Sequence, residues 1–326
     1  MISASAAPAV SALLAGGLLE LMVRGRLRMP LDRPNERSLH ANPVPRSGGV
    51  AVMAGALASL VLLPAPAALA APALALALVS LADDWRGLPI ALRFLAHAAA
   101  AAAFIWLALG GLPWWLQGVM AILVMWMTNL YNFMDGSDGL AGGMTVSGFG
   151  FLGIAAYLAN DATLALAAFC IAAAALVFLL YNFHPARIFM GDAGSIPLGF
   201  MAAALGLLGW QRGLWPLWYP ALVFAPFIAD ASATLARRIL RGERFWEAHR
   251  GHYYQRLVQM GWGHRKTALA EYALMLACGI AAFLALGQPA YFQVAIVVAT
   301  SALLVSLAIW VDVRWRRAGK AFLETR

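Results

Sequence analysis

Long apolar runs separated by short polar segments make up most of the chain. A helix needs about 20 apolar residues to cross the hydrocarbon core of a bilayer, and eleven runs come near that length. The runs cover residues 5–23, 48–63, 67–82, 91–110, 113–131, 141–160, 163–181, 195–211, 214–235, 267–286 and 290–311. The pattern predicts an all-α, polytopic integral membrane protein in which residues 1–326 form a single transmembrane domain.

Composition agrees with this prediction. Hydrophobic residues make up 63% of the chain and charged residues 12%, whereas a soluble domain has about 25% charged residues. A soluble globular protein is therefore excluded. The longest polar segments, 24–47 and 236–266, are expected to be large loops rather than separate domains.

The distribution of basic residues predicts the orientation of the chain. Lys and Arg gather in the cytoplasmic loops of membrane proteins, and eleven spans place all but one of the 23 basic residues, Arg212, on the same side. We therefore expect the N-terminus outside and a cytoplasmic C-terminal tail at 312–326. The cytoplasmic loops are expected at about 24–47, 83–90, 132–140, 182–194 and 236–266. The net charge of +8 then follows from topology and favours anionic head groups, so nucleic acid is not needed to explain it.

Two amides and two carboxylates stand at steps of three where the run 113–131 ends. They are Asn129, Asn132, Asp135 and Asp138. Ionised groups at a bilayer centre cost roughly 2.5–3.5 kcal/mol each on insertion scales, so such a cluster at a helix end implies a compensating cation or ligand. Gly136 and Gly139 indicate a break in the helix. That break would turn Asn132 and one or both aspartates toward a common pocket.

Three further carboxylates stand beside other expected helix ends. Asp83 and Asp84 are adjacent, and a like charge next to a carboxylate raises its pKa, which is typical of acid–base sites. A solvated helix end is the alternative for this pair. Asp192 stands between two glycines just before the run 195–211. It could cap that helix, or hold a metal or phosphate at the helix N-terminus.

Basic residues and histidines in the two largest loops supply candidate anion contacts. The first loop carries Arg33, Asn35, Arg37, Ser38, His40 and Arg46. It could form an anion-binding rim, because guanidinium groups suit phosphate, or it could serve only to set topology. In the second loop His249 and His252 would lie one turn apart on a helix. Such a pair can bind zinc, but the amide and carboxylate oxygens elsewhere favour Mg²⁺ or Mn²⁺, so we expect the pair to contact phosphate.

Four motifs occur in order at these expected cytoplasmic helix ends: DDWRGLP, NLYNFMDGSDGL, FMGDAGS and HRGHYYQRL, preceded by RPNERSLHANPVPRSGG. Together they resemble the polyprenyl-phosphate N-acetylhexosamine-1-phosphate transferases, glycosyltransferase family 4, over most of the chain. The resemblance implies an enzyme in which the phosphate of a membrane polyprenyl carrier attacks the sugar-bearing phosphorus of a UDP-N-acetylhexosamine. The products would be a lipid-diphosphate sugar and UMP, and the cofactor would be Mg²⁺, with Mn²⁺ as an alternative.

The resemblance also suggests a role for each motif residue. Asn132 and Asp192 would bind Mg²⁺. The catalytic carboxylates would be the acid–base or phosphate-positioning pair Asp83 and Asp84, with Asp135 and Asp138 as further pocket carboxylates. Substrate contacts would come from Arg37, Arg46, Asn129, His249, Arg250 and His252. We favour direct attack, with Asp83 helping to deprotonate the carrier phosphate, over a covalent phospho-aspartate.

One departure bears on the donor sugar. The peptidoglycan branch, phospho-N-acetylmuramoyl-pentapeptide transferase, typically carries consecutive histidines in the last loop, whereas this chain reads His249-Arg250-Gly251-His252. The sequence of this loop is more similar to that of bacterial enzymes that initiate O-antigen or other surface polysaccharides. We therefore expect UDP-GlcNAc or a 6-deoxy relative such as UDP-N-acetylfucosamine as donor and undecaprenyl phosphate as acceptor. The enzyme would reside in the bacterial inner membrane among its lipids, with the site facing the cytoplasm, and homodimerisation is compatible with this.

Two hypotheses from other functional classes remain open. Ion-coupled transporters also place carboxylates and amides at interrupted membrane helices, but near the midplane and usually in repeated halves. Here the motifs lie at one face and no inverted repeat is evident. A lipid-binding scaffold would explain the basic loops but would leave the carboxylate clusters without a role.

Overall fold

The computed structural model describes residues 4–27, 29–32, 43–60, 63, 67–244 and 249–324. Its elements are almost all helices, in the order α1 (Ala7–Val23), α2 (Gly48–Leu60), α3 (Ala67–Arg86), α4 (Ile90–Leu109), α5 (Trp114–Phe133), α6 (Leu140–Leu158), α7 (Ala162–Asn182), α8 (Asp192–Gln211), α9 (Trp218–Val223), α10 (Ala225–Leu240), α11 (Tyr253–Leu257), α12 (Gly263–Ala285) and α13 (Ala290–Glu324). A 3-10 turn, Ala4–Ala6, precedes α1, and a π-helical turn, Val258–Trp262, joins α11 to α12. The prediction of an all-α polytopic membrane protein is confirmed.

Each of the eleven expected runs contains helix. Eight helices in the described part of the chain are long and apolar enough to cross a membrane. Helix α2 has 13 residues, and the run 214–235 is divided, because α9 ends at Val223 and α10 begins at Ala225, followed by Pro226. The number of spans and the side of each terminus therefore stay predictions.

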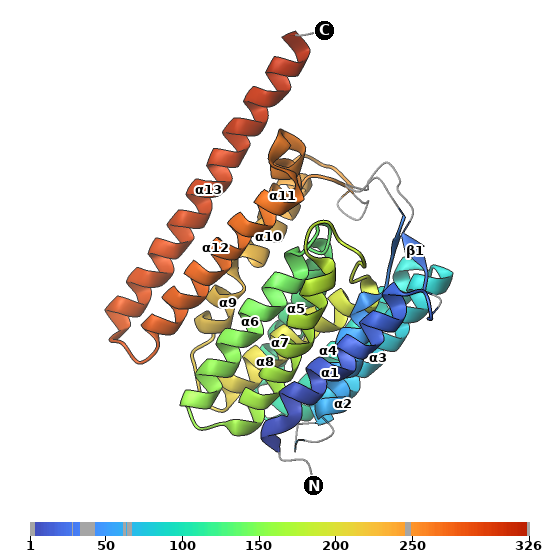
Figure 1. Ribbon diagram of the computed structural model, residues 1–326. Coiled ribbons are helices and arrows are strands. Elements are labelled where there is room, and N and C mark those ends of the chain that lie inside the picture. Colours follow the sequence, from blue (N-terminus) through green and yellow to red (C-terminus); the bar gives the residue numbers. More distant parts are fainter. Residues whose placement is uncertain are drawn as a thin grey trace.

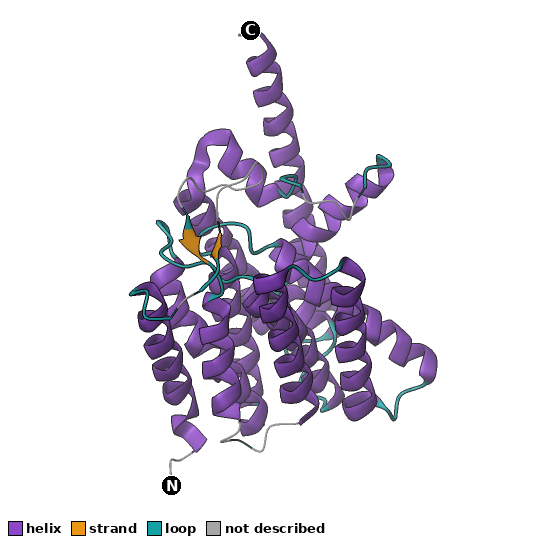
Figure 2. Cartoon of the chain, turned by 90° about the vertical axis from the view of Figure 1, so that its right-hand side faces the viewer, coloured by secondary structure: helices purple, strands orange, loops and turns teal. Residues whose placement is uncertain are grey.

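The helices form a bundle, α1 to α8, with α9 to α13 along one side (Figure 1). Helix α13 is the outermost and the least buried of the eight candidate spans. The N-terminal end of α1 and the C-terminal end of α13 lie at opposite ends of the molecule (Figure 1), as an odd number of crossings would give. Two short strands, β1 (Leu31–Asp32) and β2 (Val44–Pro45), pair antiparallel with Leu31 opposite Pro45. They lie at the end of the bundle opposite the N-terminus (Figure 2).

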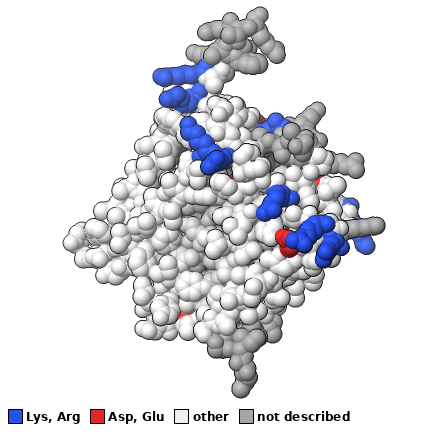
Figure 3. Space-filling model, in the orientation of Figure 1, with Lys and Arg blue, Asp and Glu red and all other residues white. Residues whose placement is uncertain are grey.

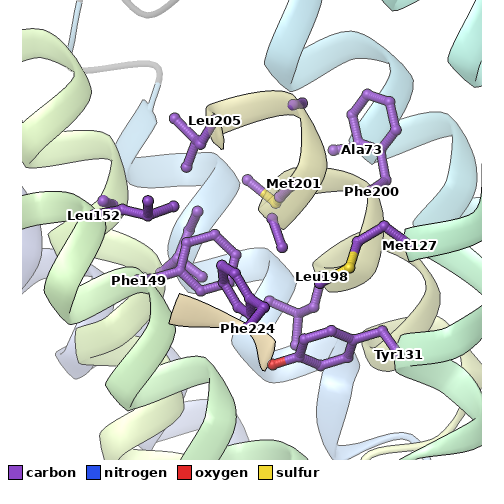
Figure 4. Packing of buried hydrophobic residues seen from close by; sticks show 14 of the residues in the cluster. Ala73, Met127, Tyr131, Phe149, Leu152, Leu198, Phe200, Met201, Leu205 and Phe224 are labelled. Atoms are coloured by element: carbon purple, nitrogen blue, oxygen red, sulfur yellow. The ribbon is translucent and has the colours of Figure 1, made fainter. Parts of the chain in front are cut away.

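Helix α8 occupies the centre of the bundle and is buried on nearly every side. It contacts α2, α3 and α5. Small residues permit this close packing, as is usual between membrane helices: a Cβ on Gly49 would lie 2.2 Å from the Cα of Gly194. Three side chains of α8, Leu198, Met201 and Leu205, pack against residues of the surrounding helices (Figure 4). These residues are Met127, Tyr131, Phe149, Leu152 and Phe224. Because α8 begins at Asp192, this packing fixes one candidate site residue at the centre of one end of the bundle.

Basic side chains gather at that same end. On the face shown in Figure 3, Lys and Arg lie below the C-terminal end at the top and at mid-height on the right, and the lowest part of the molecule shows none. At the opposite end, Arg212 Nη1 lies 2.7 Å from Asp161 Oδ2. The arrangement supports the segregation of charge on which the expected orientation rests.

Candidate active site

The loop before α2 and the loop before α8 run side by side. The Phe189 amide donates to the Pro45 carbonyl, the Gly48 amide to the Phe189 carbonyl and the Gly49 amide to the Met190 carbonyl, each at 2.8 Å. Gly191 has φ +73°, which disfavours other residues, and a Cβ there would lie only 3.1 Å from Asp84 Oδ2. These contacts bring Arg46 next to Asp84 and Asp192.

Arg46 joins two of the predicted carboxylates. Its Nη2 lies 2.7 Å from Asp84 Oδ1 and 3.1 Å from Asp192 Oδ1. The other oxygen of Asp84 accepts hydrogen bonds from Ser47 Oγ at 3.4 Å and from the Ala193 amide at 3.3 Å. The Asp84 side chain is completely buried, so its charge depends on these partners.

A second arginine, Arg93 of α4, contacts the other carboxylate of the adjacent pair. Its Nη1 lies 3.3 Å from Asp83 Oδ2 and 3.9 Å from Asp192 Oδ2. Asp83 also accepts from the amide of Leu88. Asp192 therefore lies between two guanidinium groups, and the two adjacent aspartates each have their own. Sequence reasoning missed Arg93, although a charged residue inside the expected span 91–110 was a usable signal.

The break after α5 is present where the glycines predicted it, because α5 ends at Phe133 and α6 begins at Leu140 after Gly139 with φ +77°. Asn132, in the last turn of α5, accepts a 2.7 Å hydrogen bond from Ser195 Oγ of α8. Asp135 follows in the loop. Burial and the negative charge of Asp192 raise the pKa of Asp135 well above its usual range, and a hydrogen bond from the Gly191 backbone opposes that shift. Asn132 and Asp135 thus border the Asp84–Asp192 cluster.

Asp138 belongs to a different cluster. Its Oδ2 lies 2.7 Å from His184 Nδ1 and accepts from the Ala186 amide at 3.2 Å. His264 Nδ1 lies 2.9 Å from Ser137 Oγ, and the two imidazole rings stack with centroids 5.5 Å apart. These partners tie the α5–α6 loop to the loop after α7 and to α12, and the structure does not bring Asp138 to Asp84 or Asp192.

Asn129 lies at the wall of a cavity rather than in the carboxylate cluster. Its Nδ2 donates to the Met125 carbonyl at 2.7 Å. Together with Arg93, His97 and Asn132 it lines a cavity of about 600 Å³ between α4, α5, α8 and α10. The remaining walls are apolar, formed by Ile90, Phe94, Ile122, Met125, Trp126, Phe133, Ile196 and Leu235. Arg93 and Asn132 therefore face both the carboxylate cluster and an apolar chamber.

The loop with His249 and His252 is held by Asp230 of α10. Asp230 Oδ1 accepts from the Tyr253 amide at 2.9 Å and lies 3.1 Å from His252 Nδ1, while Oδ2 accepts from the Tyr254 amide at 3.0 Å. The two imidazole rings stack at 4.9 Å. They do not share a helix, because α11 begins at Tyr253 with His252 as its N-cap, so the helical spacing considered for a zinc pair is wrong.

Two residues hold this region in place. Asp230 is not the ion-pair partner of Arg237 or Arg238, because the carboxylates that these arginines contact are Asp312 and Glu243. Tyr254 was missed: its hydroxyl donates to the Phe133 carbonyl at 3.1 Å. This bond anchors the histidine loop to the end of α5.

Arg250 shows a backbone contact, in which its carbonyl accepts from Gln259 Nε2 at 3.1 Å. Arg37 and the neighbouring residues 33–42 lie outside the described residues.

The donor atoms of the cluster suit a hard divalent cation. Carboxylate oxygens of Asp84, Asp135 and Asp192 and the amide oxygen of Asn132 are the ligand types that Mg²⁺ prefers. Asp84 Oδ1 is buried and accepts no hydrogen bond of good geometry. Arg46 Nη2 lies close enough for an ion pair, but it is not directed at this oxygen as a hydrogen-bond donor. Within the described ranges, however, no group of three or more His, Cys, Asp or Glu is placed to hold a metal by itself. A cation here would therefore share its coordination with a ligand's oxygens.

Comparison with known proteins places these residues in a family. Residues 66–209, which include Asp83, Asn132 and Asp192, match the model of glycosyl transferase family 4. The chain is 30% identical over 264 residues to a probable undecaprenyl-phosphate N-acetylglucosaminyl 1-phosphate transferase of Bacillus subtilis, which covers 75% of this chain and 74% of the relative. It is 31% identical over 304 residues to the decaprenyl-phosphate N-acetylglucosaminephosphotransferase of Mycobacterium leprae, with 77% and 74% covered.

The muramoyl branch gives a shorter match. The phospho-N-acetylmuramoyl-pentapeptide-transferase of Moorella thermoacetica is 35% identical over 195 residues, with 50% of this chain and 60% of the relative covered. The matches agree with the resemblance drawn from the four motifs. With its membrane helices and its carboxylate cluster at the end of the bundle, the chain belongs to glycosyl transferase family 4.

Proposed function

We propose that the protein transfers an N-acetylhexosamine 1-phosphate from a UDP-sugar to undecaprenyl phosphate and releases UMP. The observation that carries this proposal is the position of Asn132 and Arg93, which border the carboxylate cluster and also line the 600 Å³ cavity with mostly apolar walls. A phosphate on an isoprenoid chain needs both surroundings. The cluster offers charged partners to the phosphate, and the cavity offers apolar surface to the first isoprene units.

The relatives support the chemistry at a coarser level. Those of Bacillus subtilis and Mycobacterium leprae are named as transferases of N-acetylglucosamine 1-phosphate to undecaprenyl or decaprenyl phosphate. For this chain we infer UDP-GlcNAc as the first candidate donor, with UDP-N-acetylfucosamine as the alternative. The product would start a surface polysaccharide such as O-antigen. The cluster would lie on the cytoplasmic side of a bacterial inner membrane, because UDP-sugars are made in the cytoplasm.

The proposed reaction is a direct displacement at phosphorus. An oxygen of the carrier phosphate bonds to the sugar-bearing phosphorus, and the bond from that phosphorus to the UMP oxygen breaks, so its electron pair leaves with UMP. A protonated carrier phosphate gives its proton to Asp83. Arg46 and Arg93 are placed to attract the phosphates, because both guanidinium groups lie at the edge of the cluster and are about one-third exposed.

Mg²⁺ would be held by Asp192 and Asn132, with Asp84 and Asp135 beside them and substrate oxygens completing its coordination. When bound, it would neutralise charge on the diphosphate and on the departing UMP. Ser195 fixes the orientation of the Asn132 amide by donating to its oxygen. Mn²⁺, which accepts the same ligand types, would substitute.

The histidine loop would contact the donor. Burial and the neighbouring His252 and Arg238 lower the pKa of His249 to about 4, so its imidazole is neutral at pH 7 and can donate an N–H to a phosphate or sugar oxygen. Tyr254 anchors this loop to the end of α5, next to Asn132. We propose that His249, Arg250 and His252 bind the phosphates or sugar of the donor, together with Arg46 and Arg37.

A muramoyl-pentapeptide donor is the second candidate, favoured by the match to the Moorella thermoacetica enzyme. Against it stands the sequence His249-Arg250-Gly251-His252.

The test uses purified protein in detergent with undecaprenyl phosphate and a panel of UDP-N-acetylhexosamines, including UDP-N-acetylmuramoyl-pentapeptide. UMP release is measured with Mg²⁺, with Mn²⁺ and with EDTA. We expect release with UDP-GlcNAc or UDP-N-acetylfucosamine that EDTA abolishes. Release with the muramoyl donor alone would replace the proposed donor class, and no release with any donor from folded protein would contradict the transferase proposal.

A further inference from the structure

A second polar pocket lies where the start of α12 meets α13, outside the carboxylate cluster. Its volume is about 520 Å³, and it is lined by Met260, Trp262, Lys266, Trp310, Arg314, Arg317 and Ala318. Three of these side chains are cations and none is an acid. None of the seven residues has a role in the transfer reaction proposed above. We call this site the α12–α13 pocket.

Two tryptophans build the pocket and place its cations. The rings of Trp262 and Trp310 meet edge to face, with centroids 5.8 Å apart and an interplanar angle of 65°. Lys266 Nζ lies 4.3 Å from the centre of the Trp262 ring, and Arg314 Cζ lies 5.5 Å from the centre of the Trp310 ring. Residues four apart share one face of a helix, so Arg314 lies over Trp310 on the side of α13 that faces the pocket. The tryptophan contact thus brings cations of two helices to one place.

These cations differ from two arginines of the neighbouring helices. Arg237 of α10 and Arg256 of α11 contact Asp312, at 3.0 and 2.7 Å. Among the side chains that the structure describes, no carboxylate lies within ion-pair distance of Lys266, Arg314 or Arg317. Like charges around one pocket repel each other, and an anion between them removes that repulsion.

The position of the pocket indicates where the anion comes from. Helix α13 is a candidate membrane span, Ala290–Ala318, and the least buried of the eight, so its sides face lipid. Arg314 and Arg317 follow its apolar stretch, and tryptophans at such positions are typical of the head-group region. In Figure 3 several basic side chains lie below the C-terminal end at the top of the molecule, and no red atoms adjoin that group on the face shown. At this position the expected anion is therefore a lipid phosphate.

We propose that the α12–α13 pocket binds the phosphate of an anionic membrane phospholipid, with Lys266, Arg314 and Arg317 on the phosphate and the two tryptophans against the glycerol and upper acyl chains. A zwitterionic phospholipid has the same phosphate but also carries its own cation. The three pocket cations repel the cation of the zwitterionic head group, so the site prefers the anionic lipid.

The test uses the full-length protein in detergent and native mass spectrometry. Dioleoyl-phosphatidylglycerol and dioleoyl-phosphatidylcholine are titrated separately, and the occupancy of each is measured. We expect one tightly held phosphatidylglycerol, and a roughly 30-fold weaker affinity for it in the double variant Arg314→Gln, Arg317→Gln, as loss of two juxtamembrane cations implies. Arg316→Gln is the matched control, because Arg316 is exposed on the same helix but does not line the pocket.

Three results would overturn the proposal. The first is equal retention of the two lipids. The second is a loss of phosphatidylglycerol in Arg316→Gln as large as that in the double variant. The third is displacement of the bound lipid by excess inorganic phosphate, which would indicate a site for soluble phosphate. Lys266→Gln provides an independent variant on α12 if the double variant does not fold, and it should also weaken phosphatidylglycerol binding. Since lipid binding is measured without turnover, the result does not depend on the proposed transfer reaction.

Discussion

Arg46 Nη2 and Asp84 Oδ1 lie 2.7 Å apart, although their residues belong to different elements, the loop before α2 and the end of α3. The Asp84 side chain is completely buried and Arg46 is about one-third exposed. A buried carboxylate that loses its cation is left uncompensated, which is strongly destabilising. The pair therefore connects the stability of the bundle end to the geometry of the candidate active site.

Arg46→Gln should lower stability as well as activity. Because Arg46 is partly exposed, the loss in free energy of unfolding is expected at about 1–3 kcal/mol rather than at the higher value for a fully buried pair. Thermal unfolding in detergent measures it. Arg24→Gln is the control, since Arg24 contacts Glu20 in an exposed pair of neighbouring turns and such pairs contribute little. Equal unfolding temperatures for Arg46→Gln and wild type would show that Asp84 does not depend on Arg46.

Ser195→Ala should weaken the response to Mg²⁺. The Ser195 hydroxyl donates to Asn132 Oδ1 at 2.7 Å, and loss of a group that orients a metal ligand typically weakens metal binding about 10-fold to 100-fold. The half-saturating Mg²⁺ concentration for UMP release is therefore expected to rise at least about tenfold. Ser306→Ala, which removes a hydroxyl bonded within α13, should leave it unchanged. An unchanged Mg²⁺ dependence in Ser195→Ala would remove Asn132 from the proposed metal site.

Asp312→Ala should impair donor binding indirectly, through the position of the histidine loop. Asp312 of α13 contacts Arg256 of α11 at 2.7 Å and also accepts from the Tyr253 hydroxyl at 3.3 Å, so it positions the histidine loop. We expect KM for the UDP-sugar to rise about tenfold, the equivalent of one charge-assisted hydrogen bond, with a smaller change in kcat.

Asp161→Ala removes a carboxylate that contacts Arg212 at the opposite end of the molecule, and it is the control for Asp312→Ala. Asp312→Glu, which keeps the charge, should restore part of the affinity for the donor. A fall in kcat with an unchanged KM would instead assign Asp312 to general stability or to the chemical step.

The pH dependence of stability should include His249. The pKa of His249 is about 4 in the folded protein, against about 6.5 in the unfolded chain, so the unfolded state binds more protons between these values. Stability then falls as the pH is lowered from about 6.5 toward 4. His249→Gln should reduce this fall, which the unfolding temperatures of both proteins at several pH values measure. Parallel pH curves would contradict the neutral state of the half-buried His249 imidazole.

Local sequence patterns predicted much of the fold and of the site. The apolar runs predicted helices because bilayer thickness sets their length. The glycines after Asp135 predicted the break between α5 and α6, and the cluster of Asp84, Asp192 and Asn132 followed from placing every motif at one face.

Other features depend on contacts between distant segments. Asp138 has the same spacing as its neighbours, but His184 and His264, which hold it, lie 46 and 126 residues away. Asp230 binds backbone amides of α11, a contact that leaves no sequence pattern at residue 230. The division of α9 from α10 at Phe224 was also missed, although Pro226 in the first turn of α10 is compatible with a new helix start.

The lipid product itself provides the most direct test of the proposed transfer reaction. Wild type and Asp192→Asn, both in detergent with undecaprenyl phosphate, Mg²⁺ and the donor identified from the panel, are compared by mass spectrometry of the lipid fraction. We predict an undecaprenyl-diphosphate sugar from wild type and a loss of at least about 100-fold in its rate of formation by Asp192→Asn, with the variant still folded. Equal formation of this lipid by both proteins would contradict the placement of the reaction at the Arg46, Asp84 and Asp192 cluster.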